Sequence, residues 1–120
     1  MIHNINYQLW FKVCRSVRKQ YSVSTNVLMV LNGMYVYSRY INNNFTRRQI
    51  LDFVSYYSGP KIESYFVVLL DRGFIKESGI KLKQFQLYSI TLAGVHVIEE
   101  LNKSYEDQMY LFCSKYNIVL

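Results

Sequence analysis

The chain has 120 residues, of which 51% are hydrophobic, so it is long enough for one domain with a buried core. Its net charge of +6 favours acidic partners such as nucleic acid, although a basic solvated surface gives the same charge. The longest apolar stretches are interrupted by polar residues, and no basic segment followed by an apolar run opens the chain. These features exclude a membrane-spanning protein and indicate a cytoplasmic one.

Charged residues and cysteines are unevenly spread. Residues 1–60 carry seven Lys or Arg and one acid, whereas residues 61–120 carry seven charges of each sign. Cys14 and Cys113 lie near opposite ends, and neither has a neighbour at metal-ligand spacing. We therefore expect two reduced, buried thiols and predict no metal or cofactor site.

The first two helices are expected at residues 5–21 and 25–41. In the first, Ile5, Leu9, Val13 and Val17 recur every four residues. Its other face is basic and carries Lys12, Arg15, Arg18 and Lys19. The second helix, with Ser24 or Thr25 as its N-cap, is apolar nearly all round, which predicts that it is the central helix of the domain.

The next two helices carry strong local signals. Thr46 and Gln49 have the spacing of a capping box, and Phe45 and Ile50 have that of a hydrophobic staple. A turn at Ser58-Gly59 separates this helix from a fourth one over residues 60–72, which begins at Pro60. Gly73 is placed to end the fourth helix in a left-handed conformation.

A two-stranded hairpin and a last helix complete the pattern. Residues 74–77 are expected to form a strand, Ser78-Gly79 to open a basic loop, and residues 85–90 to form the return strand. Thr91 then starts the final helix. This order of elements predicts a winged helix-turn-helix, mainly α with a small β-hairpin.

The strings LLDRGFIKE and YSITLAG resemble the winged-helix core of MarR-type transcriptional regulators, with the PadR type a close second. Leu69, Gly73, Phe74, Ile75, Ile90, Thr91 and Gly94 fill the matching positions. The resemblance implies one winged-helix domain over residues 1–120, with its core at 25–101 and dimerisation helices at 5–21 and 95–117. MarR-type wings usually carry an Asp-x-Arg pair before the second strand, whereas this chain reads KESGIKLKQFQ there.

Three groups of residues are candidates for DNA contact. The helix at 60–72 is expected to turn its inner residues Ile62, Phe66 and Leu69 to the core, which leaves Lys61, Ser64, Tyr65 and Val68 to read bases. Arg47 and Arg48, in the first turn of the preceding helix, are expected at phosphates. Lys81 and Lys83, two residues apart, are expected to project from one side of the wing. The alternatives are a fourth helix that packs on protein, two solvated arginines, and edge lysines that deter aggregation.

The flanking helices predict self-association. Both carry apolar stripes, and we expect a homodimer interface formed by Leu9, Val13, Val17, Leu101, Tyr105, Met109 and Phe112. The alternative is that both helices fold back on their own domain and the protein is a monomer. The resemblance also implies a cleft for a small-molecule effector between the dimer helices and the winged domain. Tyr7, Trp10, Tyr35 and Tyr37 are candidates to line it, although they also suit a simple aromatic core.

No catalytic constellation competes with these interpretations. His3 and His96 are isolated, and no Ser or Cys has a partnered His. The sequence therefore predicts a non-enzymatic transcriptional regulator that binds specific double-stranded DNA as a homodimer and acts as a repressor. The alternative is a winged-helix protein-interaction module, such as a phage or mobile-element accessory protein that docks on a host complex.

Overall fold

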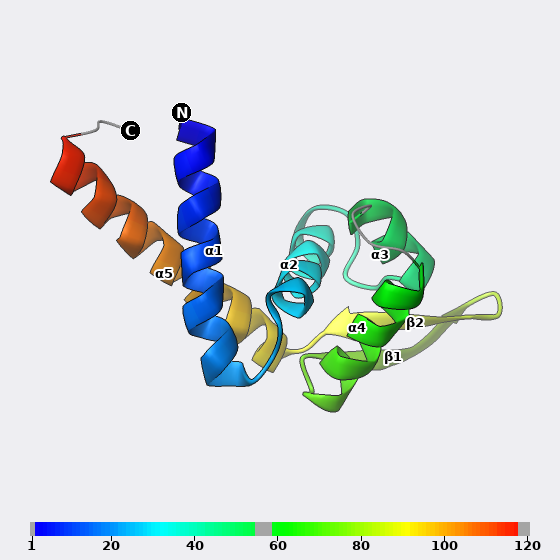
Figure 1. The fold of residues 1–120 in the computed structure, drawn as a ribbon. Helices are drawn as coiled ribbons and strands as arrows, with labels where there is room; N and C mark the ends of the chain where they lie inside the picture. The colour runs from blue at the N-terminus through cyan, green and yellow to red at the C-terminus, as the bar shows by residue number, and fades with distance from the viewer. Residues whose placement is uncertain (1, 55–58, 118–120) are drawn as a thin grey trace.

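A computed structural model of the chain describes the backbone of residues 2–54 and 59–117, and the side chains of the same residues except 2–8 and 11. It shows four helices, a hairpin and a last helix in chain order (Figure 1). Their bounds are α1 Ile2–Tyr21, α2 Thr25–Tyr40, α3 Arg47–Val54, α4 Gly59–Asp71, β1 Ile75–Leu82, β2 Phe85–Ile90 and α5 Leu92–Tyr116. The predicted winged helix-turn-helix is confirmed, and the predicted helices start and end within one turn of the observed ones.

The molecule is elongated, with principal extents of 54 × 26 × 24 Å. Helices α1 and α5 pack against each other at one end, and their free ends diverge (Figure 1). The hairpin projects from the other end, and α2, α3 and α4 lie between the two. The wing and the paired terminal helices therefore form separate surfaces.

Helix α2 is the centre of the fold, as its apolar composition predicted. It contacts α1, α3, α4, α5 and β2, and Leu28, Val30, Leu31 and Met34 have no exposed surface. Its N-cap is Ser24, whose hydroxyl accepts a hydrogen bond from the Val27 N–H at 3.2 Å. The structure thus selects Ser24 over Thr25 as the cap.

The start of α3 confirms the predicted capping box. The Gln49 side chain accepts from the Thr46 N–H at 2.8 Å, and the Thr46 hydroxyl accepts from the Gln49 N–H at 3.1 Å. Phe45, just before the helix, is fully buried and exchanges two backbone hydrogen bonds with Tyr88 of β2. This bridge fixes the N-terminus of α3 against the base of the wing.

The exit of α4 and the entry of α5 meet at one junction. Gly73 has a φ of 73° and ends α4, with the Gly73 and Phe74 N–H groups bonded to the carbonyls of Leu70 and Leu69. Thr91 caps α5 by accepting from the Gly94 N–H at 3.1 Å, and its own hydroxyl donates to the Gly73 carbonyl at 2.6 Å. The two strings that carry the family resemblance therefore hold each other in place.

The first strand of the wing is longer than predicted. Ser78-Gly79 was expected to open a loop, but β1 continues through both residues to Leu82. The register is irregular between Glu77 and Lys81, and Gly79 has a φ of 79°, so the glycine serves a bulge inside the strand. The turn is the tight pair Lys83-Gln84, which makes the wing longer and narrower than a basic loop.

Within the residues described, no helix combines the length and the apolar character that crossing a membrane requires.

Candidate nucleic-acid interface

The outer face of α4 lies next to the wing and contains two of the four predicted base-reading residues. Ile62, Phe66 and Leu69 are buried as predicted, and Lys61 and Ser64 are exposed. Tyr65 and Val68 were also expected to be exposed, but they are half-buried and pack against the core, and their contact with bases stays a prediction. The helix is rotated so that its Tyr65–Val68 flank faces inward and Val67 is exposed instead.

The same face of α4 also carries acids that the sequence analysis did not weigh. Glu63 and Asp71 are both exposed, on either side of Val67. Lys61 is the one cation within Gly59–Asp71. The face is therefore mixed in charge, and most of the cations near it belong to α3 and the wing.

Arg47 has a structural role that its position in the sequence does not reveal. Its guanidinium donates a hydrogen bond to the Glu63 carboxylate of α4 and forms an ion pair with it. The guanidinium carbon also lies 5.7 Å from the Phe66 ring centroid and 5.3 Å from that of Tyr88, which are cation–π distances. Arg47 thus ties α3 to α4 and to β2, and the Glu63 carboxylate competes with any phosphate for its guanidinium.

Arg48 is exposed and makes one ion pair within its own helix. Its Nε lies 3.2 Å from an oxygen of Asp52 one turn along α3, and both side chains are largely exposed. An exposed pair of this kind is worth only about 0–1 kcal/mol, so a phosphate can displace the carboxylate. The side chain projects from the first turn of α3, where the helix dipole also favours an anion.

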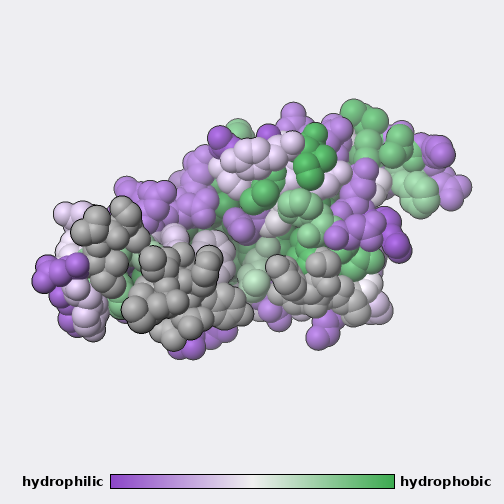
Figure 2. All heavy atoms as spheres, turned by 90° about the horizontal axis from the view of Figure 1, so that it is seen from above, coloured by the Kyte–Doolittle hydropathy of each residue, from purple (hydrophilic) through white to green (hydrophobic). Residues whose placement is uncertain are grey.

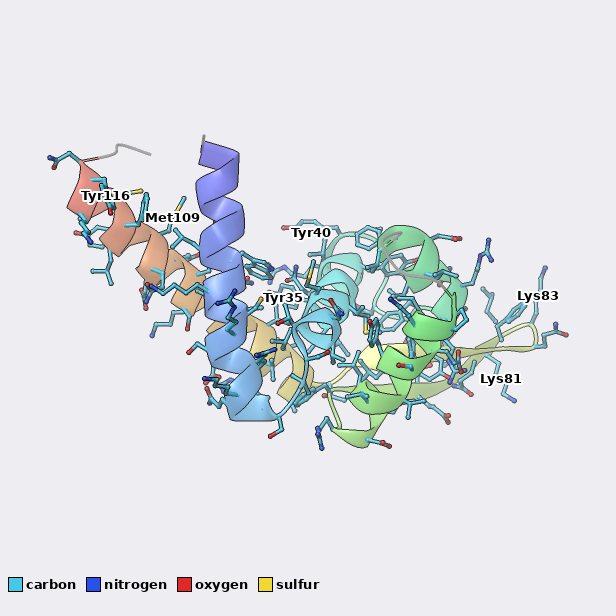
Figure 3. The ribbon with its side chains drawn as sticks, viewed as in Figure 1. Tyr35, Tyr40, Lys81, Lys83, Met109 and Tyr116 are labelled. Atoms are coloured by element: carbon cyan, nitrogen blue, oxygen red, sulfur yellow. The ribbon has the colours of Figure 1, made fainter. Side chains whose placement is uncertain are left out.

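The wing carries Lys81 and Lys83, both exposed, toward the far end of the molecule (Figure 3). They do not project from one side as predicted, because Lys81 belongs to β1 whereas Lys83 is in the turn with a φ of 58°. Alternation of side chains holds only along extended backbone. Lys76, also exposed on β1, is a third wing cation that sequence reasoning missed.

A groove separates the N-terminus of α3 from the wing. Its volume is about 660 Å³, and its walls include Arg48 and Gln49 on one side and Leu82 and Phe85 on the other. The floor includes Thr46 and Tyr88, the latter buried. One basic wall and one apolar wall therefore face each other across it.

The predicted dimer residues fall into two groups. Leu9, Val13, Val17 and Leu101 are buried within the single chain, so the prediction that they form a surface for a second chain was wrong. The stripes of α1 and α5 cover each other, and Tyr105 packs edge-on against Trp10 with ring centroids 5.8 Å apart. Met109 and Phe112 are half-buried near the end of α5, where Met109 can be seen in Figure 3. They lie beside the exposed Tyr110, Leu111 and Tyr116.

A polar tie also joins the two terminal helices. The Tyr21 hydroxyl of α1 donates to the Glu100 carboxylate of α5, and this bond raises the pKa of Tyr21 to about 12. The other Glu100 oxygen lies 3.2 Å from His96 Nε2, and His96 is an exposed residue. The Tyr21–Glu100 bond fixes α1 on α5 at the end nearest the winged core, and the His96 pair lies within α5.

The aromatic residues proposed for an effector cleft are dispersed. Trp10 lines a hollow of about 360 Å³ with residues of α2 and α3, whereas Tyr35 lines a separate one of about 450 Å³. Tyr37 is buried in the core, edge-on to Phe45 and Phe53. The Tyr7 side chain lies outside the described part of the structure.

The two cysteines lie in the interior of the protein. Cys14 and Cys113 are both buried and free, and burial raises the pKa of the Cys14 thiol to about 11. At neutral pH Cys14 is therefore protonated and a poor nucleophile. Among the described side chains, no three of His, Cys, Asp or Glu gather as a metal site needs.

Comparison with solved structures identifies the fold. No family model matches the chain, and no curated protein matches it in sequence. MepR of Staphylococcus aureus, a transcription regulator of the multidrug efflux pump MepA, is similar with a TM-score of 0.77 and 13% identity over 95% of this chain and 80% of MepR. The S. aureus MepR–DNA complex gives a TM-score of 0.75 and 12% identity over 96% of this chain and 82% of that one. Wild-type apo MarR from E. coli gives a TM-score of 0.72 and 11% identity over 96% of this chain and 81% of MarR. The chain therefore has a MarR-like winged-helix fold.

Proposed function

We propose that this protein binds specific double-stranded DNA as a homodimeric transcriptional regulator, and that it represses by occupying a promoter. The observation that carries the proposal is the exposed α4 bearing Lys61 and Ser64 beside a lysine-bearing wing, in a fold shared with a regulator solved on DNA. The major groove is about 12 Å wide and admits an α-helix, which is the role we assign to α4. We place the protein in the cytoplasm, where Cys14 and Cys113 stay reduced.

Phosphate contacts set affinity in this proposal, and α4 sets specificity. Arg48, Lys61, Lys81 and Lys83 are exposed cations on α3, α4 and the wing, around the face that α4 presents. Each one that neutralises a phosphate releases condensed counterions, which makes binding fall steeply with salt. Ser64 can donate to a base edge, and Val67 takes the place of Val68 as the apolar group that can meet a thymine methyl.

The experiment that tests the proposal is a salt titration of binding to a random-sequence duplex. A protein that makes several phosphate contacts loses affinity in proportion to a power of the salt concentration. Affinity that is absent at low salt, or unchanged between 50 and 200 mM salt, would overturn it.

Dimerisation is proposed through the C-terminal half of α5. Tyr110, Leu111 and Tyr116 are 72%, 59% and 57% exposed, which is unusual for large side chains with apolar bodies at one end of a small chain. Met109 and Phe112 lie half-buried beside them, so a second chain can extend the apolar contact inward. A pair of chains joined there carries two wings and two α4 helices, as a two-fold DNA site requires.

We predict that replacing Tyr110 and Leu111 with Asp converts the dimer to monomers, because it places two charges in an apolar contact. Light scattering of the unmodified chain should give about twice the 14.3 kDa of one chain, and the variant should give 14.3 kDa. High salt alone should leave the dimer intact, since exposed ion pairs contribute only about 0–1 kcal/mol each. Ile41→Asp, at an exposed apolar residue at the end of α2, is the matched control and should stay dimeric. An unmodified chain that is monomeric at micromolar concentration contradicts the proposed assembly.

An effector site is proposed in the hollow that Trp10 lines. It lies where α1 meets α2 and α3, so an occupant contacts both α1 and the winged core. Met29, Val36 and Phe53 make its walls mainly apolar, which suits a small apolar ligand. Quenching of Trp10 fluorescence by such a ligand is the direct readout, because the chain has one tryptophan.

A protein-interaction module is the second candidate function, and one observation favours it. Glu63, Val67 and Asp71 give the outer face of α4 an acidic and apolar character that suits a protein partner better than a phosphate backbone. A phage or mobile-element accessory protein that docks on a host complex fits this face. The Glu63 charge separates the two candidate functions, because it opposes binding of this face to DNA and does not oppose binding to a protein partner.

We predict that Glu63→Gln tightens binding to a random duplex about three- to tenfold at 100 mM salt, equivalent to roughly 0.7–1.4 kcal/mol. The substitution frees the Arg47 guanidinium and removes a negative charge from the face that meets phosphate. Asp107→Asn on α5 makes the same change in net charge far from the wing and is the control, expected to change affinity less than twofold. Equal effects of the two substitutions in fluorescence anisotropy, or weaker binding by Glu63→Gln, would favour the protein partner.

A further inference from the structure

The wing carries exposed apolar side chains next to its polar turn, Lys83-Gln84. Ile80, Leu82 and Phe85 are 54%, 50% and 53% exposed. Leu82 and Phe85 are direct cross-strand partners, on either side of the turn Lys83-Gln84. Apolar side chains gather at this end of the molecule among hydrophilic ones (Figure 2). Paired large side chains at the tip of a two-stranded hairpin do not cover the core, so their partner has to lie outside the chain.

The charge around this apolar pair indicates what the partner is. Lys81 precedes Leu82 and Lys83 follows it. Strand β1 and the turn together contain three lysines, Lys76, Lys81 and Lys83, and one acid, Glu77. A partner that accepts both an apolar tip and the cations beside it combines negative charge with a narrow apolar slot. The minor groove of DNA has this combination, with phosphates along its rims and base edges and stacked rings inside.

The turn holds the tip in one shape. Lys83 has a φ of 58°, a conformation that glycine adopts at no cost and that lysine adopts rarely. Lys83 at this position places its charge at the very end of the hairpin, beside the Leu82–Phe85 pair. Both apolar residues also form one wall of the groove beside α3, so DNA backbone that lies along Arg48 passes next to them.

We propose that Leu82 and Phe85 enter the minor groove as an apolar wedge that opens a base step and bends the DNA, while Lys81 and Lys83 contact the phosphates on its rims. The inference rests on the proposed DNA-binding function and extends it to how the wing recognises sequence. A wedge opens flexible pyrimidine–purine steps most readily, so the wing selects sites with a TA or CA/TG step beneath it. This selection needs no hydrogen bond from the wing to a base.

The test compares DNA bending by the unmodified chain and by Leu82→Ser/Phe85→Ser. A duplex labelled at both ends reports the bend by energy transfer, and 2-aminopurine at the step under the wing reports unstacking by a rise in fluorescence. The unmodified chain should bend the duplex by roughly 20–90°. The double variant should keep the salt slope of binding, because it loses no charge, and should lose at least half of the bend and the fluorescence rise.

Two controls keep the result interpretable. Leu82→Met/Phe85→Leu retains an apolar tip and should keep the bend, whereas Leu92→Ser removes an exposed apolar residue of α5 that is distant from the tip and should have no effect. A chain that binds duplexes with a steep salt slope but leaves them straight overturns the wedge and leaves the proposed function standing. A double variant that changes the mass in light scattering and not the bend assigns the tip to a contact between chains. Failure to bind any duplex removes both the wedge and the function on which it rests.

Discussion

Replacing Arg48, Lys61, Lys81 and Lys83 together with alanine is expected to abolish measurable binding to any duplex at about 150 mM salt. The four cations are exposed on α3, α4 and the wing, and each lost phosphate contact reduces the slope of log affinity against log salt by about 0.9. In a dimer every substitution removes two contacts, so the slope should become less steep by about seven units. Anisotropy titrations of a labelled random duplex at four salt concentrations measure both quantities.

A second quadruple variant separates a local contact from the overall charge. Lys12, Arg15, Arg18 and Lys19 are exposed on α1, which lies at the end of the molecule opposite the wing. Their replacement by alanine removes the same charge but should change the slope by less than about two units, because the proposed docking through α4 and the wing leaves α1 on the far side, beyond the Debye length of about 8 Å. Equal losses for the two variants would mean that the DNA surface has been assigned to the wrong face.

Gly94→Ala is expected to destabilise the fold by about 3 kcal/mol or more, at the upper end of the range for overpacking. A Cβ at this position would lie 2.2 Å from the Phe74 carbonyl oxygen and 2.8 Å from Ile90 Cγ1. That oxygen already accepts the Thr91 N–H at 3.0 Å, so relief of the clash requires backbone movement at the junction of α4, β1 and α5. Urea denaturation followed by circular dichroism measures the change in the free energy of unfolding.

The control for this prediction lies two residues away. Leu92 is 89% exposed in the first turn of α5, so Leu92→Ala should change stability by less than about 0.5 kcal/mol. If Gly94→Ala were as mild as Leu92→Ala, the close packing of α5 on Phe74 would be wrong. The role of YSITLAG as the connection between wing and helix would then be lost.

Much of the fold could be predicted from the sequence because its signals are local. The Thr46–Gln49 box, Gly73 at the end of α4 and Thr91 at the start of α5 each act over three to five residues, and all three form as expected. The apolar character of residues 25–41 likewise predicted a central helix. Capping and periodicity need no knowledge of the partner element.

The interface was harder to predict because its geometry depends on partners distant in sequence. The Arg47–Glu63 pair joins residues of two helices, and the rotation of α4 that exposes Val67 rather than Val68 follows from what packs on its flank. Gly79 predicted a loop, but cross-strand pairing turned it into a bulge. The apolar stripes of α1 and α5 were expected to contact a second chain, but the two helices pack against each other within one chain.

Selection from a pool of random duplexes tests the central claim most directly. A homodimer that reads DNA through two α4 helices should enrich an inverted repeat whose half-sites are centred about 10–10.5 base pairs, or a multiple of that, apart. Lys61→Ala/Ser64→Ala should lose that preference while still binding unselected DNA. A pool that remains random after repeated rounds, with the folded chain present at micromolar concentration, would contradict sequence-specific DNA binding by this protein.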